Sequence, residues 1–414
     1  MPRPANQHGG DECDYPDVLP DGAVRGRGAA LNPGNRYVGS DPKRGVIRRL
    51  HVLGEHLDEV HRARLSGDGE GCAAASQVRT EVRPDSTRTI INRVDSPDIS
   101  FHWSINPYRG CEHGCIYCYA RPDHERLGYS CGLDFETKII AKFEAPQLLR
   151  RELAHPKWQG ETIVFSGVTD PYQPVEREHR ITRGCLEVIA ECRQCVGIVT
   201  KSRLVLRDLD LLKELARHNA VRVGLSVTTL DNRLASKMEP RASSPAERLE
   251  TLAALRDAGV QTFAMLAPII PGLNDREIPA LLKAVSEAGA PSAGYILLRL
   301  PHQIKALFLD WLNRHYPDRA GRVESLLRQV RGGQLYDPAF GVRQRGQGPI
   351  AAQINTLFET FARRYRLDGA MAPLNRGAFR RPVLTGDLPG DRAPTSGQLS
   401  LFGDSTLEQG KTCA

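Results

Sequence analysis

The sequence predicts an α/β fold: a partial (β/α)6 barrel of the TIM type, with a loosely ordered N-terminal extension and a small helical C-terminal extension. Two observations carry this prediction. Short apolar segments typical of buried strands recur about every 25–40 residues through the middle of the chain, and segments with apolar residues at helical spacing lie between them. Strands that are apolar along most of their length and alternate with helices form parallel sheets covered by helices.

The expected strands number six, which is too few for a closed eight-stranded barrel. In barrels of this type the chemistry lies at the carboxyl ends of the strands. A group of cysteines follows the first expected strand, in the position that this rule predicts. The six strands are expected at 102–106, 162–170, 196–202, 221–229, 261–270 and 292–300.

Capping residues mark two of the helices between these strands. In SSPAERLETLAALRDAG, Ser244 is expected to cap the helix, Glu247 to complete a capping box and Gly259 to end the helix. A second segment, NDREIPALLKAVSEAG, repeats this pattern with Asn274, Glu277 and Gly289.

Composition and spacing divide the chain into four parts. The first 45 residues are rich in Gly, Pro, Asn and Asp and have no periodicity, so we expect no fixed structure there. Beyond residue 301, three segments have apolar residues at helical spacing. We therefore expect a largely disordered N-terminal extension at 1–85, the core barrel at 86–301, a basic helical extension at 302–380 and a disordered tail at 381–414.

The overall composition, with 40% hydrophobic and 25% charged residues, is that of an ordinary soluble protein. The chain has no run of 18 apolar residues that would predict a transmembrane helix. Its first residues, MPRPANQHGGDECDYPD, lack the apolar stretch of a signal peptide. We therefore expect a cytoplasmic protein that does not bind membranes.

Positive charge is concentrated near the C-terminus. Residues 331–381 contain nine arginines, no lysines and three acidic residues. A basic segment of this kind can bind phosphate groups, which would make a nucleic acid the partner. A solvated arginine-rich surface is the alternative, and the sequence leaves both open.

Three of the ten cysteines, Cys111, Cys115 and Cys118, fall within eight residues. Where thiols stay reduced, such a group indicates metal binding or catalysis before disulfides. A structural zinc site needs four ligands, and Cys131 is the best candidate for the fourth. A cubane iron–sulfur cluster also usually takes four cysteines, so three would leave one iron open to a substrate or a second cofactor.

The spacing of these cysteines, Cys-x3-Cys-x2-Cys with the aromatic Tyr117 before the third, resembles the signature of the radical S-adenosylmethionine (SAM) superfamily. The resemblance implies a [4Fe–4S] cluster on Cys111, Cys115 and Cys118 whose open iron binds SAM. It also implies that an electron from a reductant such as a ferredoxin or flavodoxin cleaves SAM to a 5′-deoxyadenosyl radical, which abstracts hydrogen from a substrate. The superfamily uses the partial barrel predicted above.

Longer segments resemble one branch of the superfamily, related to spore photoproduct lyase and often described as DNA-repair-photolyase-like. They are INPYRGCEHGCIYCYARP, GLDFETKI, TDPYQPVE, TKS, EPRASS and APIIPGLND, spanning roughly residues 85–301. The N-terminal segment GRGAALNPGNRY also resembles a recurring feature of this branch. The resemblance implies lyase-like chemistry on a nucleic-acid lesion or modified base. Radical modification of a protein or small metabolite, and a non-catalytic iron–sulfur sensor, are the alternatives.

The resemblance further implies where SAM is bound, mainly at the ends of the second to fourth strands. For Thr169 and Asp170 the alternative role is a helix cap. Cys131 is a candidate for returning a hydrogen atom, as a cysteine does in spore photoproduct lyase, and Tyr119 and Arg121 are expected to line the site. The expected cofactor-binding residues are Tyr117, Gly167, Thr169, Asp170, Lys201, Ser226 and Arg241.

Overall fold

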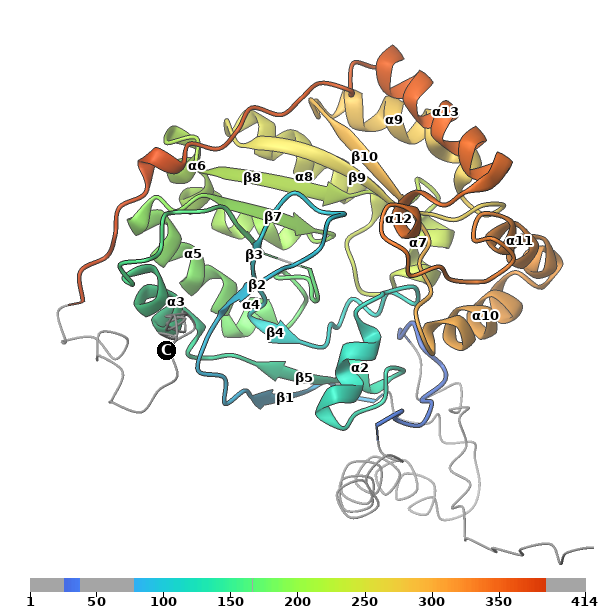
Figure 1. The fold of residues 1–414 in the computed structure, drawn as a ribbon, viewed down its shortest axis with the longest axis horizontal. Coiled ribbons are helices and arrows are strands. Elements are labelled where there is room, and N and C mark those ends of the chain that lie inside the picture. The colour runs from blue at the N-terminus through green and yellow to red at the C-terminus, as the bar shows by residue number, and fades with distance from the viewer. Residues whose placement is uncertain (1–25, 38–77, 166, 385–414) are drawn as a thin grey trace, which may run out of the picture.

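The structure, a computed structural model, describes residues 26–37, 78–165 and 167–384. Its strands form a larger sheet of seven and a smaller sheet of three (Figure 1). The larger sheet contains β2 (Ile91–Arg93), β3 (Trp103–Ile105), β6 (Ile163–Phe165), β7 (Val196–Thr200), β8 (Val221–Ser226), β9 (Gln261–Ile269) and β10 (Ala293–Leu297). Their order across the sheet is β10-β9-β8-β7-β6-β3-β2.

Six of these strands, β3 and β6 to β10, are the six that the sequence predicts, and each pairs in parallel with its neighbour. β2 was not predicted and pairs with β3 in the antiparallel direction. Within the described residues no ladder joins β10 to β2, so the sheet is open, as expected of a partial barrel. Because the six strands are parallel, their carboxyl ends meet at one edge of the sheet.

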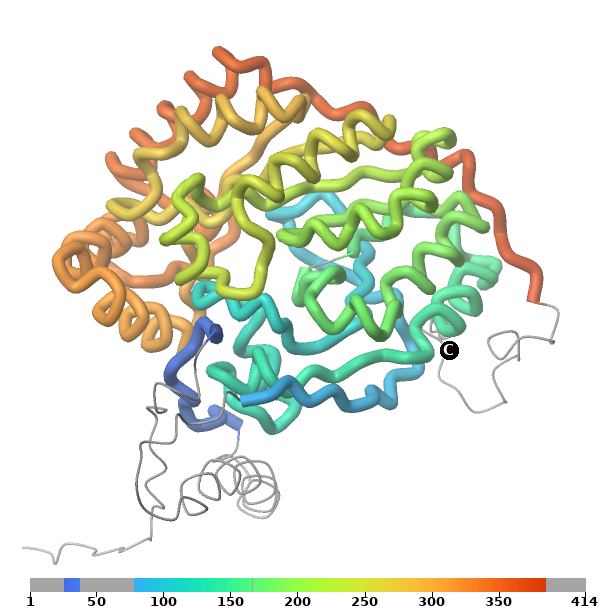
Figure 2. The backbone as a smooth tube through the Cα atoms, turned by 180° about the vertical axis from the view of Figure 1, so that it is seen from behind, coloured from blue at the N-terminus to red at the C-terminus, as the bar shows by residue number. Residues whose placement is uncertain are grey.

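The helices that connect these strands pack on one face of the larger sheet (Figures 1 and 2). Val221, Val223 and Leu225 of β8 are buried, as are Leu252 and Leu255 on the helix that packs on that strand. This apolar layer is the main core. The helices are α3 (Ala145–Leu153), α5 (Ile181–Cys192), α6 (Leu209–Arg217), α8 (Pro245–Asp257) and α9 (Ile278–Glu287), with the shorter α2 (Asp134–Thr137), α4 (Glu176–His179) and α7 (Asn232–Met238).

The capping box predicted for α8 is confirmed. The Ser244 hydroxyl accepts a hydrogen bond from the Glu247 N–H at 3.3 Å, and the Glu247 carboxylate accepts one from the Ser244 N–H at 2.8 Å. Gly259 follows the helix with a φ of +79°, a conformation that favours glycine.

The second predicted capping box is wrong. The amide oxygen of Asn274 accepts from the Ile270 N–H at 2.6 Å, and its NH2 group donates to the Thr228 carbonyl at 2.8 Å. The Glu277 carboxylate accepts from the Leu230 N–H at 2.7 Å. Both side chains therefore join the loops after β8 and β9, and α9 begins after a 3-10 turn.

The smaller sheet was not predicted. It contains β1 (Glu81–Pro84), β4 (Tyr108–Arg109) and β5 (Lys138–Ala141), in the order β1-β5-β4. Part of the expected N-terminal extension (1–85) thus has defined structure. Its residues 81–84 form β1 of the smaller sheet, and residues 26–37 pack against the core. The rest of that extension, 1–25 and 38–77, lies outside the described residues.

The C-terminal extension is helical, as predicted. None of the described helices is long and apolar enough to cross a membrane. Beyond the last helix the chain runs past α6 to α3 (Figure 1), and the Asn375 N–H donates to the Asn219 carbonyl just before β8. This segment therefore covers the sheet edge opposite the strands' carboxyl ends. The helices are α10 (Ile304–His315), α11 (Pro317–Gln329), α12 (Val342–Arg345) and α13 (Gly348–Arg364), and the 3-10 turns are Arg121–Leu127, Arg203–Asp208, Asp275–Glu277 and Arg376–Ala378.

Candidate cluster and cofactor site

The three cysteines lie on one loop, residues 110–120, which follows β4 and which we call the cysteine loop. Cys111 and Cys115 are buried, Cys118 is half-buried, and all three are free thiols. Burial raises the pKa of all three thiols, that of Cys115 to about 12. Metal ions overcome such a shift, because a coordinating thiol loses its proton outright.

A single zinc ion is the alternative occupant of these side chains. In the described part of the chain, no three His, Cys, Asp or Glu side chains converge closely enough to hold one metal ion. Cys131, the candidate fourth ligand, is buried, and its Sγ lies 3.1 Å from the amide oxygen of Gln303. The Cys131 thiol thus has a partner of its own in Gln303, and the zinc alternative stays open.

The connection after β6 holds the cysteine loop along its length. The side-chain oxygen of Asn106, just before the loop, accepts from the Val168 and Thr169 N–H groups at 3.1 and 3.4 Å. The Thr169 hydroxyl donates to the Tyr108 carbonyl at 3.2 Å. Thr169 is buried, so its hydroxyl supports the loop. Its contact with SAM stays a prediction.

Gln173 clamps the backbone of the loop from both sides. Its amide oxygen accepts from the Glu112 N–H at 2.9 Å, and its NH2 group donates to the Gly110 carbonyl at 3.2 Å. The side chain is fully buried. Sequence reasoning placed no such role on Gln173, because both of its partners are backbone groups more than 60 residues away.

Asp170 joins the cysteine loop to the end of β7. Its carboxylate accepts from the Thr200 hydroxyl at 2.7 Å and the Lys201 N–H at 2.9 Å, and it lies 3.3 Å from His113 Nδ1. Burial alone would raise the pKa of Asp170, but His113 and these donors lower it to about 2. Asp170 also accepts from the Tyr172 N–H, so its oxygens are largely occupied within the chain. A bond to the ammonium group of SAM stays a prediction.

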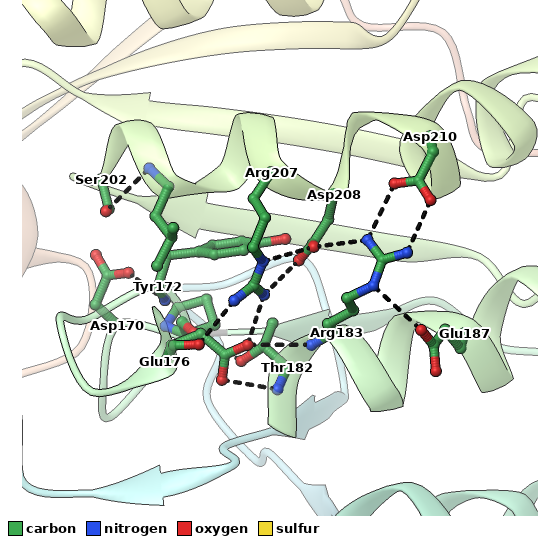
Figure 3. Close-up of polar contacts among 12 residues, drawn as sticks. Asp170, Tyr172, Glu176, Thr182, Arg183, Glu187, Ser202, Arg207, Asp208 and Asp210 are labelled. Carbon is green, nitrogen blue, oxygen red and sulfur yellow. Dashed lines mark hydrogen bonds and ion pairs between the residues drawn. The ribbon is translucent and has the colours of Figure 1, made fainter. Parts of the chain in front are cut away.

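A buried ionic network lies beneath this connection (Figure 3). The Glu176 carboxylate accepts from the Arg207 guanidinium at 2.7 Å. It also accepts from the Tyr108 hydroxyl at 2.5 Å. Arg207 also binds Asp208 at 2.8 Å, and Asp208 binds Arg183 at 3.0 Å. Glu176 and Asp208 are fully buried. Breaking either ion pair would therefore leave a buried charge without its counter-ion, which is strongly destabilising. Through Tyr108 the network supports the start of the cysteine loop.

Glu239 is the main site residue that the sequence did not reveal. Its buried carboxylate is bound by the Tyr117 hydroxyl, by the Thr228 hydroxyl at 2.7 Å and by the Arg248 guanidinium. Arg248 also donates to the Ser226 carbonyl at 3.0 Å. The contact between Glu239 and Tyr117 fixes the aromatic residue that precedes the third cysteine. In the sequence, Glu239 was marked only as the first residue of EPRASS, one of the segments that resemble the related branch.

Lys201 differs from the other cations near the loop. Arg241 pairs with Glu112 at 2.9 Å, whereas no carboxylate in the described residues forms an ion pair with the Lys201 ammonium. That ammonium lies 5.9 Å from the centre of the Tyr117 ring. Burial alone would lower the pKa of Lys201, but Cys115 and Glu239 raise it. Lys201 is thus a positively charged group without a carboxylate of its own.

Gly167 leaves space beside the cysteine loop. Its φ is +143°, and a Cβ built on it would meet no atom within 4 Å. The Gly167 carbonyl accepts from the Tyr119 hydroxyl. Ser226, at the end of β8, is buried, and its contact with SAM stays a prediction, as does that of Arg241. A glycine beside open space permits the close backbone approach of a ligand.

Arg121 was expected to line the site but is fully buried. Its guanidinium donates to the Cys115 carbonyl at 2.9 Å and the Gly114 carbonyl at 3.1 Å, and it pairs with Glu136 at 2.5 Å. The prediction is corrected for a physical reason: the donors of this buried guanidinium are taken up by backbone carbonyls and by Glu136, so none faces a substrate.

Cys131 packs in the same apolar cluster as Cys115 and Tyr117. Burial raises the pKa of its thiol to about 12, which keeps the hydrogen on sulfur. Its role in returning a hydrogen atom stays a prediction.

Comparison with known proteins identifies the class of protein that this fold and loop define. Residues 105–285 match the radical SAM superfamily. An uncharacterised protein of Mycobacterium tuberculosis is 34% identical over 245 residues, which cover 58% of this chain and 72% of that one. One from Methanocaldococcus jannaschii is 31% identical over 214 residues, covering 52% and 76%. The chain belongs to the radical SAM superfamily.

Two further proteins are similar at lower identity. The radical SAM Nalpha-GlyT isomerase of Pseudomonas phage M6 is 27% identical over 319 residues, covering 74% of this chain and 63% of that one. A solved structure of spore photoproduct lyase complexed with dinucleoside spore photoproduct is 16% identical, with a TM-score of 0.50, covering 76% and 93%. The second likeness shows a shared fold.

The superfamily implies a [4Fe–4S] cluster and SAM, and the residues present fit both groups. Three free thiols on one loop supply three ligands, and the next described cysteine along the chain, Cys131, lies outside that loop. The open space at Gly167 and the ammonium of Lys201 lie beside the same loop. An amino acid such as the methionine part of SAM has a carboxylate that a lysine can bind.

Proposed function

We propose that this radical SAM enzyme holds a [4Fe–4S] cluster on Cys111, Cys115 and Cys118 and that its substrate is a damaged or modified base in a nucleic acid. When bound, the cluster and SAM supply a 5′-deoxyadenosyl radical that removes a hydrogen atom from the substrate. The observation that carries the proposal is the set of three thiols on one loop, beside a lysine whose ammonium forms no ion pair with any carboxylate of the described residues.

The chain's own residues would orient the cofactor. Lys201 would bind the carboxylate of SAM, and the Asp170 carboxylate, which accepts from the Lys201 N–H, would hold the lysine backbone in place. Gly167 would allow the cofactor to approach the backbone. The Tyr117 ring, fixed by Glu239, would keep the Lys201 ammonium over the loop.

Alanine in place of Lys201 is expected to weaken SAM binding. A hydrogen bond to a charged group contributes about 1.5–3 kcal/mol, so the Kd for SAM should rise about 10- to 100-fold. Anaerobic equilibrium dialysis of SAM against reconstituted protein measures this, with iron content unchanged. Lys283→Ala, at a surface lysine on α9 that pairs loosely with Glu287, is the matched control and should bind SAM like the wild type. Equal Kd values for both variants would remove Lys201 from the cofactor site.

The decisive experiment for the activity is anaerobic reconstitution with iron and sulfide, followed by SAM and a reductant. Dithionite would stand in for the ferredoxin or flavodoxin that we propose as the natural donor. We expect formation of 5′-deoxyadenosine. A protein that binds the cluster and SAM but never forms this product would be the non-catalytic sensor, and the enzyme proposal would fall.

An exposed aromatic residue favours a nucleobase as the substrate. Tyr119, directly after the third cysteine, is 47% exposed, and the Arg299 guanidinium lies 5.0 Å from the centre of its ring. Proteins that bind single-stranded nucleic acids stack bases on such aromatic and guanidinium faces.

The arginine-rich region contributes less free charge than its sequence indicates. Arg331 is buried and donates to the Leu298 carbonyl at 2.8 Å, and Arg343 pairs with Asp98. Arg381 donates to the Trp158 carbonyl at 2.7 Å, at the sheet edge opposite the cysteine loop. Contact between residues 331–381 and phosphate groups stays a proposal, and it would rest on the remaining exposed arginines.

Alanine in place of Tyr119 is expected to weaken the binding of single-stranded DNA or RNA. Loss of one stacked base costs about 1–3 kcal/mol, which raises the Kd about 5- to 150-fold. Phe143→Ala is the matched control, because Phe143 is an equally exposed aromatic residue, at 46%. Filter binding across a salt series measures both. If neither nucleic acid binds, the nucleic-acid proposal falls in favour of a protein or small metabolite. If the two variants bind equally, Tyr119 does not stack a base.

A further inference from the structure

Residues 26–37, which we call the N-terminal strap, lie against the cysteine loop. Figure 2 shows this blue segment beside the teal part of the chain that contains the loop and α2, and next to α10. About 40 residues of sequence separate the strap from the next described segment. The mechanism proposed above makes no use of it.

The strap completes the buried ion pair that supports the loop. The N–H groups of Gly28 and Ala29 donate to the Glu136 carboxylate at 2.9 and 2.8 Å. The same carboxylate pairs with Arg121, which also donates to the Gly114 and Cys115 carbonyls of the loop and, at 2.8 Å, to the Gly132 carbonyl. Both side chains of the pair are fully buried. Without the strap, Glu136 would lose two donors and water would reach the pair.

Two glycines show how closely the strap and the loop region approach. A Cβ on Gly28 would lie 1.8 Å from the Gly114 carbonyl oxygen, and a Cβ on Gly132 would lie 2.1 Å from the Leu31 carbonyl oxygen. Neither glycine has a positive φ, so contact alone requires the absence of a side chain. By contrast, a Cβ on Gly34 of the strap would meet nothing within 4 Å.

Further polar contacts fasten the strap at its far end. The Asn35 side chain donates to the Glu125 and Tyr129 carbonyls at 2.7 and 2.9 Å. Ser130 donates to the Pro33 carbonyl at 2.7 Å. Ala29 is buried in the same apolar cluster as Cys115. Hydrogen bonds thus fix the strap at two places, at Gly28 and Ala29 and again at Pro33 and Asn35.

We propose that the N-terminal strap is part of the cluster site: it fixes the backbone of the cysteine loop through Glu136 and Arg121 and keeps water and solutes from the cluster. Its residues are positioning residues, since they act through the loop. The inference rests on the proposed function, because it requires a cluster on the three cysteines. Outer-shell contacts of this kind typically change metal affinity about 10- to 100-fold.

The test uses glycine-to-alanine variants in the full chain. Gly28→Ala and Gly132→Ala should push the strap from the loop, whereas Gly34→Ala makes the same chemical change in the strap without a contact. Gly184→Ala places its Cβ 2.8 Å from a side-chain carbon of Pro146 between α5 and α3, and serves as a milder clash outside the strap and the cysteine loop. Each protein is reconstituted anaerobically and assayed for bound iron and for the rate at which an Fe(II) chelator bleaches the cluster absorbance.

We expect Gly28→Ala and Gly132→Ala to bleach about 10- to 100-fold faster than the wild type, while Gly34→Ala and Gly184→Ala bleach at the wild-type rate. Equal rates in all five proteins would overturn the inference. So would an equal acceleration by Gly184→Ala, because the effect would then come from lowered overall stability. Failure of the wild type to bind any cluster would instead count against the proposed function.

Discussion

Alanine in place of Cys115 is expected to abolish both cluster binding and the formation of 5′-deoxyadenosine. Cys115 is buried, packs in the apolar cluster that contains Tyr117, and is one of only three cysteines on its loop. With two thiols left, the loop cannot hold four irons and present a single open one. Iron and sulfide content after anaerobic reconstitution, together with chromatography of the SAM products, measures the loss.

Two other cysteines serve as controls for this variant. Cys185, fully buried in α5, should tolerate alanine with iron content unchanged. Cys131→Ala separates two hypotheses about the loop: in a zinc site with Cys131 as fourth ligand it would lose the metal, whereas the cluster proposal expects full iron content. Retention of a normal cluster by Cys115→Ala would show that the three-cysteine site is wrong.

The barrel was predictable because its signal is local. Each of the six parallel strands is a short apolar segment, and Ser244 and Glu247 mark α8 within four residues of sequence. The smaller sheet lacks such a signal, since β4 spans only Tyr108–Arg109 and pairs with residues about 30 positions away. Asn274 illustrates the opposite error: its side chain fits a cap, but strand-end backbone groups compete for it and prevail.

The same distinction holds at the site. The cysteines are recognised from their spacing, whereas the support of their loop comes from remote segments. Tyr117 and Glu239 are 122 positions apart, and the Glu136 carboxylate meets the Ala29 N–H across 107 positions. Neither separation leaves a pattern in a single sequence.

The segment TDPYQPVE acquires a structural meaning from these contacts. The resemblance assigns its first two residues to SAM binding, but Thr169, Asp170, Gln173 and Glu176 each bind a group of the cysteine loop or of β4 just before it. The segment runs alongside residues 106–113 and fixes them at intervals. Its side chains are therefore needed to place the three thiols, whichever of them also contacts the cofactor.

Replacing Glu239 by glutamine is expected to destabilise the protein more than any surface change. The substitution keeps the shape of the side chain but leaves the buried Arg248 without its counter-ion. Breaking such a buried pair lowers the free energy of unfolding by about 3–5 kcal/mol. At neutral pH the native carboxylate is charged: burial alone would raise the pKa of Glu239, but Arg248 and Lys201 lower it. Urea unfolding of the apo-protein measures the loss, and Glu250→Gln, at an exposed carboxylate 3.5 Å from Arg203, should change stability by less than about 0.5 kcal/mol.

A second measurement separates the ion pair from the site. Because Glu239 also accepts from the Tyr117 hydroxyl, its loss should loosen the ring below Lys201 and weaken SAM binding. Adding Arg248→Met to Glu239→Gln removes the unpaired charge and should restore much of the stability, whereas SAM binding should stay weak because Tyr117 still lacks its charged acceptor. If the double variant recovered both, Glu239 would act only as the counter-ion of Arg248.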